Sequence, residues 1–185
     1  MSAGTVPAAT APETRPETTI RPITYAGVVV AVILSFVVFG FSGDAIIASV
    51  FSAALVVIGA SDLEWRIIPN RIVLPAAALV LVLNIAIHPS HMFEWIGAAA
   101  ASFGFFFVVA LINPAGLGMG DVKLAFLLGA GLGWDVAAAL ILGTFASAVY
   151  AVFLVLTRPG AGAKTAFALG PFLAGAALFV LFVAH

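Results

Sequence analysis

Two aspartates in this sequence lie at the edges of long apolar runs, where a carboxylate is rarely placed without a reason. Asp121 ends the glycine-rich stretch GLGMGD at residues 116–121, and Asp62 closes an earlier apolar run. A carboxylate at the edge of the hydrocarbon layer costs free energy unless it is paired, protonated or solvated, so it indicates function by default. The chemistry depends on whether Asp62 and Asp121 meet.

A pair of carboxylates has a definite chemical use. When the two groups lie close together they repel, so one takes up a proton while the other stays ionised, and they titrate as a unit. Such a pair is suited to hydrolysis of a peptide bond. The ionised carboxylate takes a proton from water, and the protonated one donates to the carbonyl oxygen and then to the leaving nitrogen. This chemistry requires no metal, no cofactor and no covalent intermediate.

The composition places these aspartates in a membrane protein. Hydrophobic residues make up 64% of the chain, charged residues 8%, and the mean hydropathy is +1.25, values that no soluble domain with a polar surface could carry. A net charge of -1 gives no basic surface for nucleic acid. The absence of cysteine excludes disulfides, thiolate metal sites and a cysteine nucleophile.

The apolar runs predict an all-α, polytopic transmembrane helical bundle of about seven spans. They are Ile23 to Phe41, Ala45 to Ala60, Ile72 to Ile87, Trp95 to Ile112, Asp121 to Leu132, Val136 to Leu156 and Ala166 to Ala184. Residues 1–21 have no hydrophobic period and are expected to form a disordered cytoplasmic tail. The fifth run is short for a membrane crossing, which usually takes ~20 residues.

The distribution of charge decides whether the fifth run crosses. If all seven runs cross, every basic residue falls on one side: Arg15, Arg21, Arg66, Arg71, Lys123, Arg158 and Lys164. The opposite side then holds Asp44, Glu94 and Asp135, which is the positive-inside pattern. We therefore expect seven crossings with the amino terminus and both Asp62 and Asp121 on the cytoplasmic side of the cell membrane. The short fifth helix would pack among its neighbours through Gly129 and Gly133.

Three ordered motifs resemble those of a known family. Residues 118–124 (GMGDVKL) resemble the GxGD signature of type IV prepilin peptidases, which are membrane aspartic proteases. Asp62, followed by Ile68-Pro69-Asn70, looks like the family's first catalytic aspartate and its Ile-Pro-Asn segment. Residues 167–175 (FALGPFLAG) are similar to its glycine-proline-phenylalanine-leucine segment. The likeness runs from about Ala45 to the end of the chain.

This resemblance implies that the protein removes a short basic leader from prepilin precursors at the cytoplasmic face. It implies that Asp62 and Asp121 are catalytic. Seven other residues would bind substrate or shape the site: Gly118, Gly120, Lys123, Pro69, Asn70, Gly170 and Pro171. Glycines at 118 and 120 also permit sharp turns and close approach of an extended substrate backbone.

The chain differs from the larger family members, which carry a cysteine-rich cytoplasmic segment and methylate the new amino terminus. The cysteine-free sequence resembles the short, peptidase-only branch, so methyltransferase activity is not expected. We divide the chain into a tail (1–21), an extra first span (22–44) and a peptidase-like domain of six helices (45–185).

Other interpretations compete with the protease. A small carrier or channel could use paired aspartates to bind a cation or proton, although it would favour ionisable residues near the midplane and an internal repeat. An intramembrane protease of the presenilin type shares GxGD but not the other two motifs. In the least specific interpretation, the glycines stop one helix, Asp121 caps the next, and Asp62 sits among lipid headgroups.

Several further residues are expected to have structural roles or to lie at the membrane interface. Lys123 would contact a phospholipid or a substrate carboxylate, or serve as a positive-inside anchor. Asn84 would form an interhelical hydrogen bond, and Gly170-Pro171 would kink the last span. Glu64 and Arg66 would line the cytoplasmic rim. His88, His91 and His185 lack ligand spacing for a metal, and Trp65, Trp95 and Trp134 would be interfacial anchors.

Overall fold

The protein is a bundle of helices, which confirms the predicted all-α class. The computed structural model describes residues 22–114, 116–157 and 169–183, and this part of the chain contains no strand. The helices are α1 (Pro22–Phe39), α2 (Gly43–Trp65), α3 (Asn70–Ile87), α4 (Met92–Ile112), α5 (Met119–Leu132), α6 (Val136–Thr157) and α7 (Gly170–Val183), with short 3-10 turns η1 (Pro89–His91) and η2 (Gly133–Asp135).

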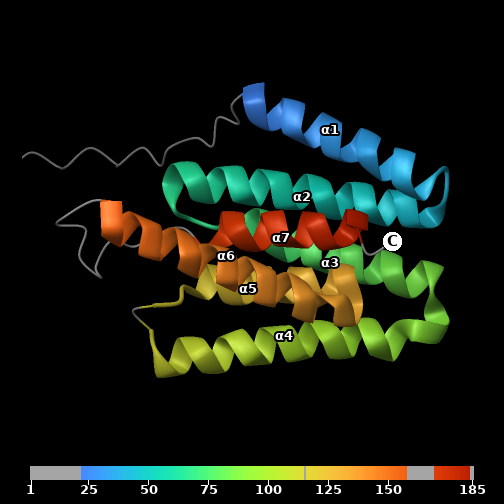
Figure 1. The fold of residues 1–185 in the computed structure, drawn as a ribbon. Coiled ribbons are helices and arrows are strands. Elements are labelled where there is room, and N and C mark those ends of the chain that lie inside the picture. The colour runs from blue at the N-terminus through green and yellow to red at the C-terminus, as the bar shows by residue number, and fades with distance from the viewer. Residues whose placement is uncertain (1–21, 115, 158–168, 184–185) are drawn as a thin grey trace, which may run out of the picture.

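Successive helices run in opposite directions along the bundle (Figure 1). The end of α2 and the beginnings of α3, α5 and α7 therefore lie at one end, which we call the aspartate end because it holds Asp62 and Asp121. The beginning of α2, the end of α3 and the beginning of α4 lie at the other end, here called the far end. The alternation agrees with the predicted up-and-down order of the helices.

Several helices are long and apolar enough to cross a membrane, so the protein is a multi-pass membrane protein. Among the described residues, five helical stretches meet that criterion by length and composition. The fifth, Met119–Thr157, contains both α5 and α6, which are separated by the turn η2 where Gly133 has a φ of 57°. Lipid cannot satisfy open backbone groups, so spanning segments of this kind must be helical.

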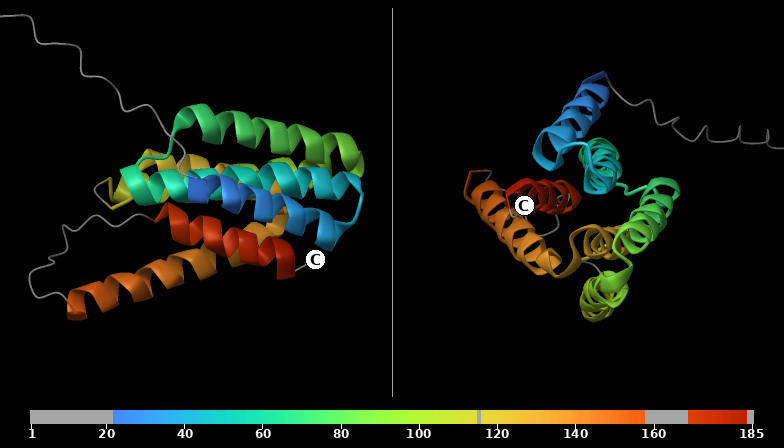
Figure 2. Two further views of the ribbon diagram at one scale, coloured as in Figure 1. Left: turned by 90° about the horizontal axis from the view of Figure 1, so that it is seen from above. Right: turned by 90° about the vertical axis from the view of Figure 1, so that its right-hand side faces the viewer.

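The short helix α5 lies inside the bundle, among α3, α4, α6 and α7 (Figure 2). Its 14 residues correspond to about 21 Å at 1.5 Å per residue, less than the hydrocarbon thickness of ~30 Å. Most of its side chains are fully buried, so protein rather than lipid surrounds it. This confirms the prediction that the fifth helix is short and packed among its neighbours.

Small and polar residues hold α5 in place. A Cβ at Gly129 would lie 2.6 Å from the Ala98 carbonyl oxygen of α4, so this position admits only glycine, as the sequence predicted. The Asn84 side chain of α3 donates from Nδ2 to the Ala130 carbonyl oxygen at 2.9 Å, which confirms the expected interhelical hydrogen bond. The Ser102 hydroxyl of α4 donates to the Ala125 carbonyl oxygen at 2.8 Å.

The first helix lies at the edge of the bundle and contacts α2 (Figure 2). The hydroxyl groups of Ser35 and Ser52 are 3.3 Å apart and hydrogen-bonded, and Gly27 faces Val56. Only Thr24, Ala31 and Ser35 of α1 are buried. The division into a separate first span and a following domain remains a prediction, and the predicted tail lies outside the described residues.

The predicted kink at Gly170-Pro171 is wrong, because these two residues begin α7 rather than interrupt it. A proline in the first turn of a helix loses no intrahelical hydrogen bond, since the first N–H groups have no partner within the helix. The residues that would have preceded a kink, 166–168, lie outside the described part of the chain. The same is true of His185.

Candidate active site

Asp62 is buried in the last turn of α2, with only 6% of its surface exposed. The backbone N–H of Gly170 donates a hydrogen bond to Asp62 Oδ2 at 3.1 Å. A Cβ at Gly170 would lie 2.6 Å from that same oxygen, so only glycine allows the approach. The third motif of the sequence therefore reaches the first aspartate through its backbone.

A second glycine, Gly59, lies one turn before Asp62 and faces α7. A Cβ at Gly59 would lie 3.6 Å from Ala174 Cβ and 3.9 Å from Pro171 Cα. These are ordinary van der Waals distances, so a methyl group would fit at this position and the approach of α7 does not require glycine.

The chain turns sharply at Arg66, where α2 ends. Arg66 is the only non-glycine residue in the described part with a positive φ, at 52°, and its N–H donates to the Asp62 carbonyl oxygen at 3.0 Å. A non-glycine residue in this left-handed conformation costs roughly 1–2 kcal/mol. The turn ends α2 and directs the following residues toward Pro69. The Arg66 side chain is exposed and lies within electrostatic range of the Asp62 carboxylate.

Asp121 lies in the first turn of α5 and is partly buried. Gly118 is the residue that caps α5, with an extended backbone (φ -77°, ψ 150°), and the Asp121 N–H donates to its carbonyl oxygen at 3.0 Å. The interpretation of Asp121 as the helix cap is therefore wrong. The Asp121 carboxyl group lies beside this cap, since a Cβ at Gly118 would be in van der Waals contact with Asp121 Oδ2 at 3.5 Å.

The two aspartates lie close enough for their charges to interact. They come from different helices, α2 and α5, and both are at the aspartate end of the bundle (Figure 1). A partial positive charge from the amino terminus of α5 is also directed toward Asp121. The two carboxyl groups thus lie at the same end of the bundle, with Asp62 buried and Asp121 partly buried. Their use as a catalytic pair stays a prediction.

The Ile-Pro-Asn segment packs directly on the GxGD turn. A Cβ at Gly120 would lie 3.0 Å from Ile68 Cβ, so any larger residue would push Ile68 away by a few tenths of an ångström. Pro69 caps α3, and its carbonyl oxygen accepts hydrogen bonds from the N–H groups of Ile72 and Val73 at 2.9 and 3.1 Å. The three sequence motifs are thus gathered around the aspartates, a contact pattern that the sequence alone did not reveal.

Lys123 does not form an ion pair with Asp121 among the described residues. Its Nζ donates to Asn70 Oδ1 at 2.8 Å instead. A residue two positions after Asp121 points to a different side of the helix. The sequence did not identify Asn70 as its partner.

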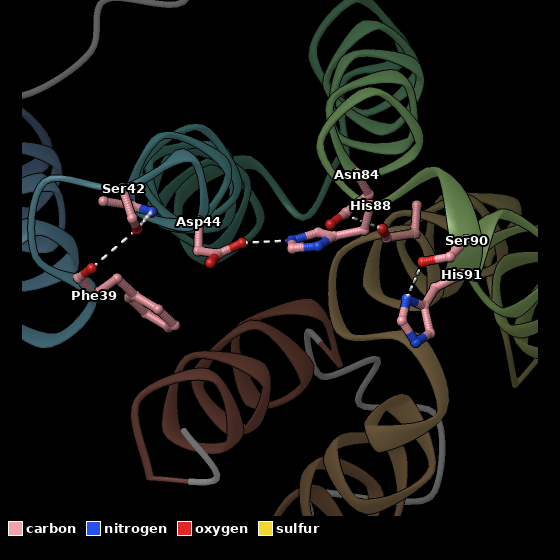
Figure 3. A network of polar contacts seen from close by, with 9 residues as sticks. Phe39, Ser42, Asp44, Asn84, His88, Ser90 and His91 are labelled. Atoms are coloured by element: carbon pink, nitrogen blue, oxygen red, sulfur yellow. Dashed lines mark hydrogen bonds and ion pairs between the residues drawn. The ribbon is translucent and has the colours of Figure 1, made fainter.

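A cavity of about 310 Å³ opens at the far end, away from the aspartates. Its lining includes Asp44, Asn84, His88, His91 and Glu94, and Figure 3 shows the His88 ring pointing at Asp44, with 2.6 Å between Nε2 and Oδ1. Because Asp44 and Asp62 are eighteen residues apart on α2, the cavity lies about 27 Å from the site along the helix.

The polar groups of this cavity differ from those of the aspartate end, because its carboxylate Asp44 contacts His88. The nearby Ser42 hydroxyl donates to the Phe39 carbonyl oxygen at 2.9 Å and accepts from the Ala45 N–H at 3.2 Å. It therefore caps α2 and is not a nucleophile for His88 (Figure 3). Within residues 22–114, 116–157 and 169–183, no three His, Asp or Glu side chains gather in a metal-binding arrangement.

Comparison with known proteins identifies relatives over the same region. A sequence model described as the type IV leader peptidase family matches residues 49–156. A protein of Bacillus subtilis (strain 168) named prepilin leader peptidase/N-methyltransferase is 32% identical over 120 residues, which are 64% of this chain and 48% of that protein. Proteins of the same name from Burkholderia pseudomallei (strain K96243) and Pseudomonas putida are 33% and 30% identical over 153 and 157 residues.

These alignments cover 78% and 77% of this chain, and 48% and 52% of the two relatives. The chain thus spans about half the length of the curated relatives it matches. No solved structure matches it.

Proposed function

Because this chain belongs to the type IV leader peptidase family, we propose that it is an aspartic endopeptidase that removes the leader peptide of prepilin-like precursors. The observation that carries the proposal is the position of Asp62 and Asp121 at the same end of the bundle, within range of each other's charge, with Asp62 held by the Gly170 N–H at 3.1 Å. The relatives' name, prepilin leader peptidase/N-methyltransferase, supports the substrate class.

The proposed reaction uses one water molecule and the two carboxyl groups. The ionised aspartate takes a proton from water, which attacks the carbonyl carbon of the leader peptide bond, while the protonated aspartate donates to the carbonyl oxygen. Collapse of the tetrahedral intermediate then sends a proton to the leaving nitrogen. The Gly170 N–H fixes Asp62 Oδ2, which limits the rotation of this carboxylate and leaves Oδ1 to contact water.

We place the reaction at the cytoplasmic face of the cell membrane. Arg66, Arg71 and Lys123 all lie at the aspartate end, and Asp44, Glu94 and Asp135 lie at the far end. Basic residues favour the cytoplasmic side, so this orientation puts the aspartates and the amino terminus inside. It would also bring them to the membrane depth at which a basic leader joins the apolar helix of a precursor.

The proposal is limited to the peptidase. The relatives are named for two activities, but the 185 residues contain no cysteine, and the larger members that methylate carry a cysteine-rich segment. Incubation of the purified protein with cleaved precursor and a methyl donor tests this point. Transfer of a methyl group to the new amino terminus would contradict it.

The positions of the charged residues support a carrier less well than they support a peptidase. In the described helices, every Asp, Glu, Lys and Arg lies within five residues of a helix end. A carrier would favour ionisable residues near the midplane, where they bind the transported ion. The charges at the aspartate end therefore favour a site that a substrate approaches from the membrane surface.

The test uses the full chain in detergent or lipid nanodiscs and a precursor probe with a short basic leader, a glycine at the junction and an apolar helix. We expect Asp62→Asn and Asp121→Asn each to lower cleavage at least about a thousandfold, since removing one member of a catalytic unit disables the unit. Glu64→Gln, an exposed acid two residues from Asp62, is the matched control. Wild-type cleavage by either Asn variant would refute the catalytic pair.

A further inference from the structure

Beyond the aspartates, one polar contact joins the two chain segments that carry them. Asn70 is the first residue of α3, eight positions after Asp62, and Lys123 lies in α5, two positions after Asp121. The Lys123 Nζ donates to Asn70 Oδ1 at 2.8 Å across 53 residues of sequence. We call this hydrogen bond the Lys123–Asn70 clasp.

The clasp lies beside a second contact between the same two segments. Ile68, two residues before Asn70, packs on Gly120, where a Cβ would lie 3.0 Å from Ile68 Cβ. Ile68 is partly buried, whereas Asn70 is exposed. The partly buried apolar contact of Ile68 and the exposed hydrogen bond of Asn70 together fix the α2–α3 connection against the first turn of α5.

The hydrogen-bond partner of Lys123 indicates what this side chain does. A lysine that serves only as a membrane anchor needs no protein partner, and a lysine that neutralises a carboxylate would contact Asp121. Lys123 instead bonds the neutral Asn70 amide. An exposed hydrogen bond of this kind contributes little to the free energy of folding, so we look for its effect in the geometry of the site.

We propose that Lys123 and Asn70 are positioning residues, whose clasp holds the first turn of α5 against the α2–α3 connection and so sets the separation of Asp62 and Asp121. This inference rests on the proposed function. A misplacement of reacting groups by 1 Å can cost on the order of a hundredfold in rate. Loosening the clasp should therefore slow the chemical step more than it weakens substrate binding.

The test measures kcat and KM for precursor cleavage in five variants of the full chain. Lys123→Met and Asn70→Ala should each lower kcat by about tenfold to a hundredfold and change KM by less than about threefold. The double variant should be no slower than the slower single one, because both changes break the same bond. Asn70→Asp keeps an acceptor oxygen for Lys123 and should retain activity.

Arg71→Met is the matched control, because Arg71 is an exposed basic residue next to Asn70 with no part in the clasp. If Lys123→Met is slow while Asn70→Ala cleaves at the wild-type rate, Lys123 acts through its charge on lipid or substrate and the inference is overturned. Equal losses in Arg71→Met and Lys123→Met overturn it as well. So would losses that multiply in the double variant, or inactivity of Asn70→Asp.

Failure of the clasp and failure of the proposed function give different results. If the Asp62→Asn and Asp121→Asn variants are inactive but the clasp variants cleave normally, only the positioning role of Lys123 and Asn70 is refuted. If the two aspartate variants cleave the precursor, the proposed aspartic peptidase function is refuted, and the positioning role of the clasp is refuted with it. The cysteine-free chain offers an independent readout: Asn70→Cys with Lys123→Cys should be linked by a short bismaleimide, and the linked protein should remain active.

Discussion

The substitution Gly170→Ala isolates the contact between α7 and Asp62. A Cβ at this position would lie 2.6 Å from Asp62 Oδ2 and 3.1 Å from Cγ, against the 3.4 Å at which ordinary contacts begin. The carboxylate or the start of α7 must therefore shift by up to about 0.8 Å. Such a shift also lengthens the hydrogen bond from the Gly170 N–H, now 3.1 Å.

The expected loss follows from the size of this displacement. Because a shift near 1 Å can cost on the order of a hundredfold, we expect kcat to fall by about a hundredfold, equivalent to about 2.7 kcal/mol. The helix itself should tolerate the change. Gly170 does not have a positive φ, and alanine is favoured over glycine within helices.

The assay is cleavage of the precursor probe at saturating concentration, with thermal unfolding in the same detergent. Gly175→Ala on the same helix is the matched control, because nothing lies within 4 Å of a Cβ placed there; it should be as active as the wild type. A Gly170→Ala variant with full activity would refute the assignment of Gly170 to the site. Equal losses in both variants would show that α7 tolerates no added methyl group, whatever its position.

Three further predictions test the fold and the location of the site. Gly129→Ala should destabilise the bundle by about 1–3 kcal/mol in thermal unfolding, because its Cβ would meet the α4 backbone at 2.6 Å, whereas Gly104→Ala, with nothing within 4 Å, should not; equal stability of the two would contradict the packing of α5. His88→Ala should cleave within about twofold of the wild type, because surface changes away from such sites have small effects; a large loss would indicate that the far-end cavity takes part. Topology reporters fused after Gly133 should report a location outside the cell membrane, and those fused at Arg66 a cytoplasmic location; a cytoplasmic signal after Gly133 would show that the fifth helix does not cross the membrane.

Much of the architecture was predictable from local patterns. The apolar runs and their breaks predicted the helices to within a few residues at most ends, because hydrocarbon admits only helical backbone here. Burial of α5 followed from its length, and the hydrogen bond of Asn84 followed from the cost of an unpaired amide in an apolar span. The orientation in the membrane rests on the distribution of charge alone and stays a prediction.

The contacts within the site were harder to predict, because they join residues far apart in sequence. The bond from Gly170 to Asp62 involves a backbone N–H, which leaves no trace in residue type beyond the glycine itself. Lys123 and Asn70 were each noted, yet nothing in their spacing pairs them. The kink expected at Gly170-Pro171 failed for a related reason, since proline suits both a helix interruption and a first turn, and hydropathy does not separate the two.

The dependence of Asp62 on α7 has a consequence for the order in which the protein matures. Ribosomes make the chain from its amino terminus, so Asp62 and Asp121 emerge well before Gly170, the donor to Asp62 Oδ2. A nascent chain halted after α6 would carry both acids but not the amide that orients the first. Under the proposed function, cleavage would therefore begin only after the last helix has been inserted, and a partly synthesised chain would leave precursors uncut.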